Sequence, residues 1–312
     1  MIGREIRSAV ITGPTGAIGT ALCRRLLRED IPVYAVVRPD SPRIANLPQH
    51  PLLRVIPCGI TELDRLPERL PAADADAFFH LAWTDTTGSG RNNMKAQTGN
   101  IRAAIDAAAA AKALHCKVFV FAGSQAEYGR VSGVLTPDTP CFPENGYGMA
   151  KLCAGAMTRT DCEAAGIDHI HLRVLSVYGI HDGAGSMIST VIRQLLAGET
   201  PQLTAGEQRW DYLYADDAAE AFFLAARDGR SGAVYPLGSG QAMPLRSYVE
   251  ALRDCINPAL PLGFGAIPYS DKQVMHLQAD ISALTADTGF LPSYDFARGI
   301  AETVAYYRQQ GL

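Results

Sequence analysis

The 312-residue chain has no long hydrophobic run, no block of basic residues and no cysteine pair at CxxC spacing. Its longest run of small residues, Ala107–Ala111, is far shorter than the roughly 20 apolar residues that cross a membrane. The apolar stretch near the N-terminus is too short and too soon broken for a signal peptide. With a formal net charge of −4, nothing marks a surface for nucleic acid or anionic lipid. We therefore expect a cytoplasmic protein with neither nucleic acid nor membrane as partner.

The seven cysteines are scattered along the chain, and their number is odd. A disulfide framework normally uses an even number, and zinc sites normally use closely spaced pairs. We expect reduced thiols that mostly pack as small apolar groups, and no metal site.

Short apolar runs alternate with helical patterns over the first half of the chain. The expected strands cover residues 8–12, 33–37, 53–56, 77–81, 117–122 and 169–175. The expected long helices cover residues 16–28, 101–113 and 147–165. This alternation predicts an α/β fold, a doubly wound parallel sheet of the Rossmann kind.

The pattern loosens beyond about residue 177, where glycine and proline separate shorter elements. Helices are expected at residues 189–197, 218–226, 247–254 and 296–309. We assign residues 1–176 to a dinucleotide-binding Rossmann domain. Residues 177–312 are mainly a smaller C-terminal substrate-binding region, from which residues 210–230 or so return to the Rossmann core.

A glycine-rich turn follows the first expected strand and opens an amphipathic helix. Its glycines, Gly13, Gly16 and Gly19, have the spacing GxxGxxG. In a Rossmann turn, such glycines allow a tight bend, close approach of a pyrophosphate, and close packing of helix on strand. The alternative is a purely structural turn. We expect a dinucleotide here, held by a set of adjoining residues: Gly13, Thr15, Gly16, Ala17, Ile18 and Gly19.

The end of the second expected strand bears on the choice of dinucleotide. An acidic residue there would bind the ribose 2′-hydroxyl of NAD, but this chain has Arg38, with Arg43 nearby. A guanidinium group suits a 2′-phosphate, so NADP(H) is the preferred cofactor. The alternative is that Arg38 is a solvated loop charge and Asp40 binds the ribose, which leaves NAD(H) open.

Tyr147 and Lys151 are four residues apart, so they share one face of an expected helix. Ser124 lies just past a strand, at the edge where open α/β sheets carry their sites. Hydride transfer at an alcohol carbon needs a base for the hydroxyl proton, and a nearby ammonium favours the phenolate form of tyrosine. These residues predict a catalytic set in which Tyr147 is the acid/base and Ser124 holds the substrate oxygen.

In this order, the motifs resemble the extended short-chain dehydrogenase/reductase family, the NAD-dependent epimerase/dehydratase group. The matching segments span nearly the whole chain: Thr12–Gly19, His80–Trp83, Asn100 ahead of the Ala-rich helix, Phe121–Gly129, Tyr147–Lys151, Leu172–Gly179, Trp210–Ala221 and Ala279–Pro292. The resemblance implies a nucleotide-activated sugar as substrate and a homodimer as assembly.

The resemblance also implies further contacts around the site. Leu81, Ala82 and Asn100 are expected on the cofactor side, with Tyr147 and Lys151. On the substrate side we expect Thr84, Ser124 and Gln125, with Arg209 near a diphosphate. A surface Arg209 stacked on Trp210 is the alternative for that residue.

Relatives that dehydrate 4-keto sugars carry an Asp-Glu pair directly after the active-site Ser or Thr, where this chain has Gln125 and Ala126. Dehydration is therefore disfavoured, with Glu127, one place further on, as the remaining candidate acid. Arg38 favours net reduction of a 4-keto sugar at C4. The alternatives are a 4-epimerase with tightly bound NAD, a reductase of a non-sugar carbonyl, and a non-catalytic NADP(H)-binding protein.

Overall fold

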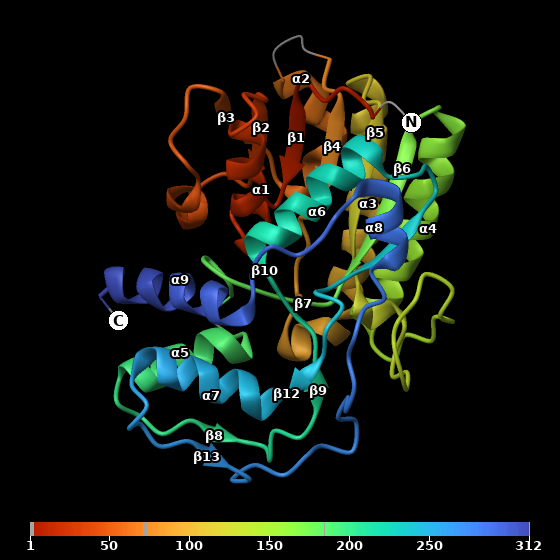
Figure 1. Cartoon of the computed structure of the whole chain (residues 1–312). Helices are drawn as coiled ribbons and strands as arrows, with labels where there is room; N and C mark the ends of the chain where they lie inside the picture. The colour runs from red at the N-terminus through yellow and green to blue at the C-terminus, as the bar shows by residue number, and fades with distance from the viewer. Residues whose placement is uncertain (1–2, 71–73, 184, 312) are drawn as a thin grey trace.

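The computed structural model describes residues 3–70, 74–183 and 185–311. In these residues, seven parallel strands form one sheet, in the order β11-β6-β5-β4-β1-β2-β3 (Figure 1). The strands are β1 (Ala9–Thr12), β2 (Val33–Val37), β3 (Leu53–Pro57), β4 (Ala77–His80), β5 (Val118–Ser124), β6 (Asp168–Val174) and β11 (Val234–Leu237). The order reverses between β1 and β4, where open α/β sheets bind ligands. The Rossmann prediction is confirmed.

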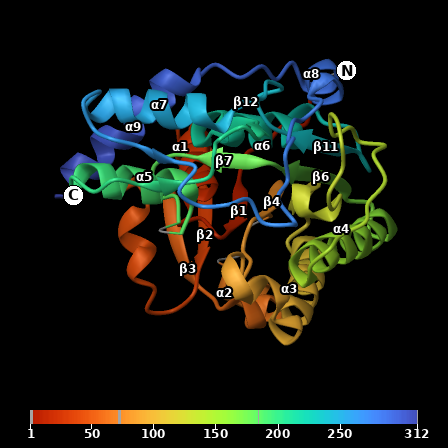
Figure 2. The ribbon, with the colours of Figure 1, turned by 90° about the horizontal axis from the view of Figure 1, so that it is seen from below.

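Helices cover both faces of this sheet (Figure 2). One layer contains α1 (Ala17–Leu27) and α6 (Ala215–Asp228), and the other contains α2 (Leu66–Arg69), α3 (Met94–Ala113) and α4 (Gly146–Ala164). Successive strand residues point to opposite faces. In β1, Val10 accordingly packs with the α3 layer and Ile11 with the α1 and α6 layer.

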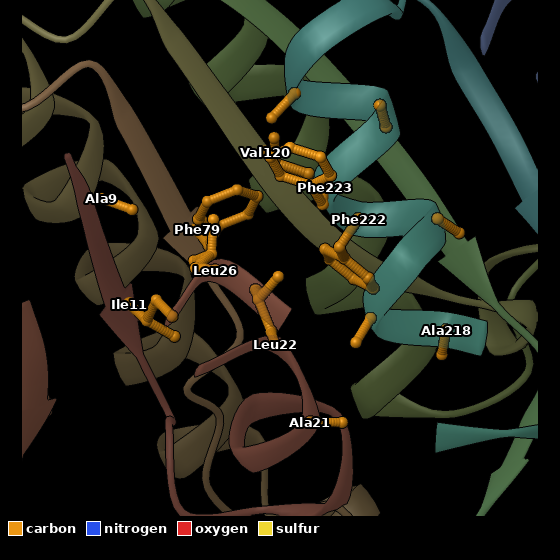
Figure 3. Close-up of a cluster of buried hydrophobic side chains, with 14 of the residues drawn as sticks. Ala9, Ile11, Ala21, Leu22, Leu26, Phe79, Val120, Ala218, Phe222 and Phe223 are labelled. Carbon is orange, nitrogen blue, oxygen red and sulfur yellow. The ribbon is translucent and has the colours of Figure 1, made fainter. Parts of the chain in front are cut away.

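The core between the sheet and α6 is built from large apolar side chains (Figure 3). Leu22 and Leu26 of α1 and Phe222 of α6 are fully buried there against Phe79 and Val120 of the sheet. Burial of each such Leu or Phe side chain contributes about 1.5–3 kcal/mol to folding. The apolar packing therefore fixes α6 to the Rossmann sheet, although α6 comes late in the chain.

Most of the remaining C-terminal elements form a separate apolar cluster next to the carboxyl edge of the sheet (Figure 1), whereas α8 (Ser282–Thr288) packs against α6. The helices of this cluster are α5 (Met187–Leu196), α7 (Leu245–Ile256) and α9 (Phe296–Gln309). Three short strand pairs accompany them: β7 (Ser176–Tyr178) with β10 (Tyr212–Tyr214), β9 (Arg209–Trp210) with β12 (Met243–Pro244), and β8 (Gln202–Leu203) with β13 (Gly263–Phe264). The domain boundary near residue 177 stays a prediction. No helix in the described parts of the chain has the length and apolar character to span a membrane.

The sequence-based start of α3 was wrong. The helix begins at Met94 instead of Ile101, because the Asn93 side chain caps it by accepting a hydrogen bond from the Ala96 N–H at 3.3 Å. Its first turns are polar and carry little hydrophobic periodicity, so the sequence pattern did not predict them as helix. Asn100 consequently lies inside the helix and does not precede it.

Asp216 and Asp217 lie in the first turn of α6. No side chain caps this helix. The buried Asp217 carboxylate accepts hydrogen bonds from the backbone N–H groups of Ser293 and Tyr294, at 3.0 and 2.9 Å. It thereby fixes the segment that leads into α9, while Asp216 pairs with Arg24 at 2.7 Å.

Candidate active site

The glycine-rich turn joins β1 to α1 at the switch point of the sheet. Gly13 has φ +70°, and a Cβ there would lie 2.8 Å from the backbone nitrogen of Ala82. A Cβ on Gly19 would overlap the carbonyl of Gly13. At Gly16 the nearest atoms to a Cβ are 4.0 Å away, so this glycine faces open space. Because α1 begins there without a side-chain cap, its first N–H groups stay available to an anion such as a pyrophosphate.

Arg43 lies beside this turn. Its Nη2 atom is 4.0 Å from the Cβ position at Gly16 and donates to the carbonyl of His181 at 3.2 Å. Arg43, Asn46 and His181 also line a cavity of about 350 Å³ between the Rossmann edge and α9. Arg38 and Asp40, the residues singled out for the ribose, are both exposed at the end of β2. Arg43 therefore places a cationic side chain beside the glycine-rich turn.

His80, the last residue of β4, is fully buried. Its Nδ1 atom lies 2.9 Å from the hydroxyl of Thr12, which also accepts the N–H of Ala82 at 3.3 Å. Burial, assisted by the charge of Lys151, lowers the pKa of His80 to about 3. His80 is therefore a neutral core histidine that fixes the ends of β1 and β4.

Ser124 ends β5 and begins the single 3-10 turn Gln125–Glu127. Its hydroxyl accepts a hydrogen bond from the Ala126 N–H at 3.2 Å, and its own N–H donates to the Glu127 carboxylate at 2.7 Å. This reciprocal pair is a capping box. Because the hydroxyl oxygen is an acceptor in the turn, its proton can be donated to a substrate oxygen.

Glu127 points into the protein and is fully buried. One carboxylate oxygen also meets His171 Nε2 at 3.0 Å, and the other accepts from Arg173 Nε at 2.7 Å. Burial alone would raise the pKa of Glu127, but His171, Arg173 and the Ser124 N–H hold it below its ordinary value. The carboxylate is therefore ionised and already paired, which removes it as the acid of a dehydration step.

Tyr147 and Lys151 lie on the first turns of α4, which Asn145 caps by accepting the Gly148 N–H at 2.9 Å. Burial raises the pKa of the Tyr147 phenol, and a hydrogen bond with Ser124 and the charge of Arg91 oppose that rise. Lys151 Nζ donates to the carbonyl of Ala122 at 2.7 Å and lies 5.9 Å from the Tyr147 ring centroid. Burial lowers the pKa of Lys151 to about 7. The fold thus brings the three expected catalytic residues together.

Two residues to which the motifs gave no role also contact this set. The Arg91 guanidinium lies 4.8 Å from the Tyr147 ring centroid, and its buried Nε atom has no hydrogen-bond partner in the described part of the chain. The Trp83 ring centroid lies 3.8 Å from Lys151 Nζ. Both belong to the segment between β4 and α3.

The remaining expected contact residues lie around this centre. Asn100 Oδ1 accepts from the backbone N–H and the hydroxyl of Thr84, both at 3.0 Å, so this pair is fixed by mutual contacts. Gln125 is half-buried next to Ser124. Arg209 is exposed on β9 and donates to the Ala242 carbonyl, whereas Trp210 donates from Nε1 to the Ser176 hydroxyl at 2.6 Å. A role of Arg209 at a diphosphate stays a prediction.

A phosphate-binding turn at the switch point, next to a Ser–Tyr–Lys set, defines the extended short-chain dehydrogenase/reductase class. The family model described as "NAD dependent epimerase/dehydratase family" matches residues 9–238, and the chain belongs to this family. The resemblance inferred from the motifs is confirmed.

The alignments with individual relatives cover nearly the whole length of the chain. The chain is 23% identical to CDP-abequose synthase of Salmonella muenchen, over 96% of this chain and 97% of the relative. It is 25% identical to dTDP-glucose 4,6-dehydratase of Streptomyces griseus, over 96% and 94%. Among solved structures, UDP-N-acetylglucosamine 4-epimerase from Methanobrevibacter ruminantium M1 superposes with a TM-score of 0.88 at 26% identity, over 98% of this chain and 100% of that one.

Proposed function

We propose that the protein is an NADP(H)-dependent reductase of a nucleotide-activated 4-keto sugar, with Tyr147 as the acid at C4. The observation that carries the proposal is the site itself: Ser124, Tyr147 and Lys151 lie together at the carboxyl edge of the sheet, and the Glu127 carboxylate is paired with His171 and Arg173. The relatives named above include a dehydratase. This chain lacks the acidic pair for elimination, since Gln125 and Ala126 stand in its place.

The residues at the phosphate turn fit a dinucleotide. Open space at Gly16 and the free N-terminal N–H groups of α1 would hold the pyrophosphate, and Arg43 and Arg38 supply positive charge nearby. When bound, the nicotinamide supplies the hydride. Leu81 and Ala82 would contact it from the end of β4, with Asn100 supporting the loop at Thr84.

The chain's own residues then handle the proton. The Ser124 hydroxyl donates a hydrogen bond to the C4 carbonyl oxygen and holds it at the phenol. As the hydride reaches C4, the Tyr147 hydroxyl gives its proton to that oxygen, and Lys151 and Arg91 stabilise the resulting phenolate. Burial raises the pKa of Tyr147 and so keeps the phenol protonated before the reaction, as proton donation requires.

The second candidate is a 4-epimerase that keeps NAD bound, oxidises C4 and returns the hydride to the other face. The likeness to the Methanobrevibacter 4-epimerase favours it. Mass spectrometry of the purified native protein separates the two, followed by thermal-shift measurements with nucleotide sugars. Reduction predicts an empty site that prefers NADPH and consumes it with a 4-keto nucleotide sugar. Co-purified NAD, with interconversion of 4-epimers and no net consumption of cofactor, would replace reduction by epimerisation.

We also propose a homodimer paired through α3 and α4. Met149 and Met157 lie eight residues apart on α4 and are 49% and 44% exposed, which leaves apolar surface on the outer face of this helix. Light scattering of the purified protein tests the assembly, and a monomeric mass would refute it.

A further inference from the structure

Trp83 connects the loop after β4 to the catalytic lysine. The Lys151 ammonium lies 3.8 Å from the indole centroid, closer than to the rings of Phe121 at 5.2 Å and Tyr147 at 5.9 Å. The indole meets the Tyr147 ring edge-on, with centroids 6.2 Å apart and an interplanar angle of 84°. Trp83 therefore contacts both members of the YxxxK pair.

The indole is fixed at its polar end. Its Nε1 atom donates to Gln97 Oε1 at 2.9 Å, and Gln97 is only 2% exposed on α3. The same amide donates from Nε2 to the carbonyls of Asp85 and Gly90, at 3.0 and 3.2 Å. The ring cannot turn away from the lysine without breaking this partly buried hydrogen bond.

The buried Lys151 ammonium has few other groups near it that stabilise its charge in the part of the chain that the structure describes. Lys151 is 3% exposed, and it forms no ion pair with a carboxylate in the described residues. The nearby Glu127 charge is directed to His171 and Arg173. After the Ala122 carbonyl, the face of the indole is the nearest aromatic neighbour of the ammonium in the described residues, and cation–π attraction is strongest in desolvated surroundings.

We propose that Trp83 is a positioning residue that holds the charged Lys151 side chain beneath Tyr147 through the face of its indole. This inference rests on the proposed function, because that function assigns Lys151 its role beside Tyr147. Loss of the indole face would leave the ammonium with the Ala122 carbonyl and two more distant rings, and so less restrained beneath the phenol. This change should slow proton transfer more than it weakens substrate binding.

Turnover of Trp83→Leu and Trp83→Phe tests this role. We expect kcat of the Leu variant to fall roughly tenfold, or about 1.4 kcal/mol, with substrate KM unchanged. The Phe variant keeps an aromatic face and should recover most of the loss. Phe142→Leu, which removes a 74% exposed aromatic ring, is the control. Wild-type kcat in Trp83→Leu would overturn the inference.

A spectroscopic test keeps Trp83 in place and so does not depend on whether its variants fold. The chain has two tryptophans, so Trp210→Phe makes Trp83 the sole indole fluorophore. Its emission should titrate with a midpoint near pH 7, where Lys151 loses its proton, and Lys151→Met should abolish the titration. A flat emission, or a titration that persists in Lys151→Met, would overturn the inference.

The two proposals fail in distinguishable ways. If Tyr147→Phe and Lys151→Met both turn over like the wild type, the proposed function is wrong. If both are inactive while Trp83→Leu is fully active, only the role of Trp83 is wrong.

Discussion

Arg173 donates from Nε to the Glu127 carboxylate at 2.7 Å, and both side chains are less than one-tenth exposed. The same carboxylate accepts the backbone N–H of Ser124. A buried ion pair thus holds the turn that carries the Ser124 hydroxyl.

Removal of the cation from this pair should be costly. In Arg173→Met the Glu127 charge would be buried without its guanidinium partner, and we expect the free energy of unfolding to fall by about 3–5 kcal/mol. Arg130→Met is the matched control, because its pair with Glu144 is exposed and should contribute about 0–1 kcal/mol. Urea denaturation measures both. Equal, small effects would show that the buried pair contributes little.

Glu127 should also make stability depend on pH. Burial raises its pKa, but its partners hold it below the ordinary value, so the folded state binds this proton more weakly than the unfolded chain. The contribution is complete above the pKa of an unfolded Glu, about 4.3, and is lost as the pH falls through the lower folded value. Glu127→Gln should therefore lose less stability than the wild type on acidification in thermal melts. Parallel pH profiles would contradict this.

Tyr147→Phe should abolish turnover and leave dinucleotide binding intact, because only the proton donor is lost. Ser124→Ala keeps the acid but loses the hydroxyl that holds the substrate oxygen. We expect a smaller fall in kcat, within the roughly 10²–10⁴-fold range of general acid–base effects. Steady-state assays with cofactor titration measure both. An active Tyr147→Phe variant would refute the acid/base role.

The activity should decline in mildly alkaline solution. Burial lowers the pKa of Lys151 to about 7, so the ammonium that stabilises the phenolate is lost as the pH rises through that value. The profile of kcat/KM reports groups of the free enzyme and should bend near this pH. Lys117→Met, which changes a half-exposed lysine paired with Asp76, should keep the bend. A profile without a bend below pH 9 or so would show that this proton is not needed.

Cofactor choice should depend on the cationic side chains near the phosphate turn. Arg43→Ala should weaken NADPH binding about 10–100-fold, because one hydrogen bond to a charged group contributes roughly that much affinity. NADH binding should stay nearly unchanged. Arg38→Ala is the comparison, since this exposed side chain is the one that the sequence indicated. Equal losses for both cofactors would assign Arg43 to the pyrophosphate instead of a 2′-phosphate.

The sheet, the glycine turn and the Ser–Tyr–Lys set could be predicted because each depends on local spacing. The contacts that Trp83 and Arg91 make with Tyr147 could not, because they depend on how a loop returns over α4, although Trp83 itself ends the matched segment His80–Trp83. The partners of Glu127 did leave a signal. His171 and Arg173 lie two residues apart on a buried strand, hence on one face, and a buried guanidinium there needs a carboxylate partner.

The Glu127 cluster has a consequence for local motion. Its hydrogen bonds join the turn after β5 to the middle of β6, so the turn cannot open unless the interior of the sheet separates. The Ser124 amide should then exchange its hydrogen with solvent as slowly as the central strands do, unlike a typical active-site loop. Any movement that admits substrate would therefore have to come from other segments around the site, and not from the turn at Ser124.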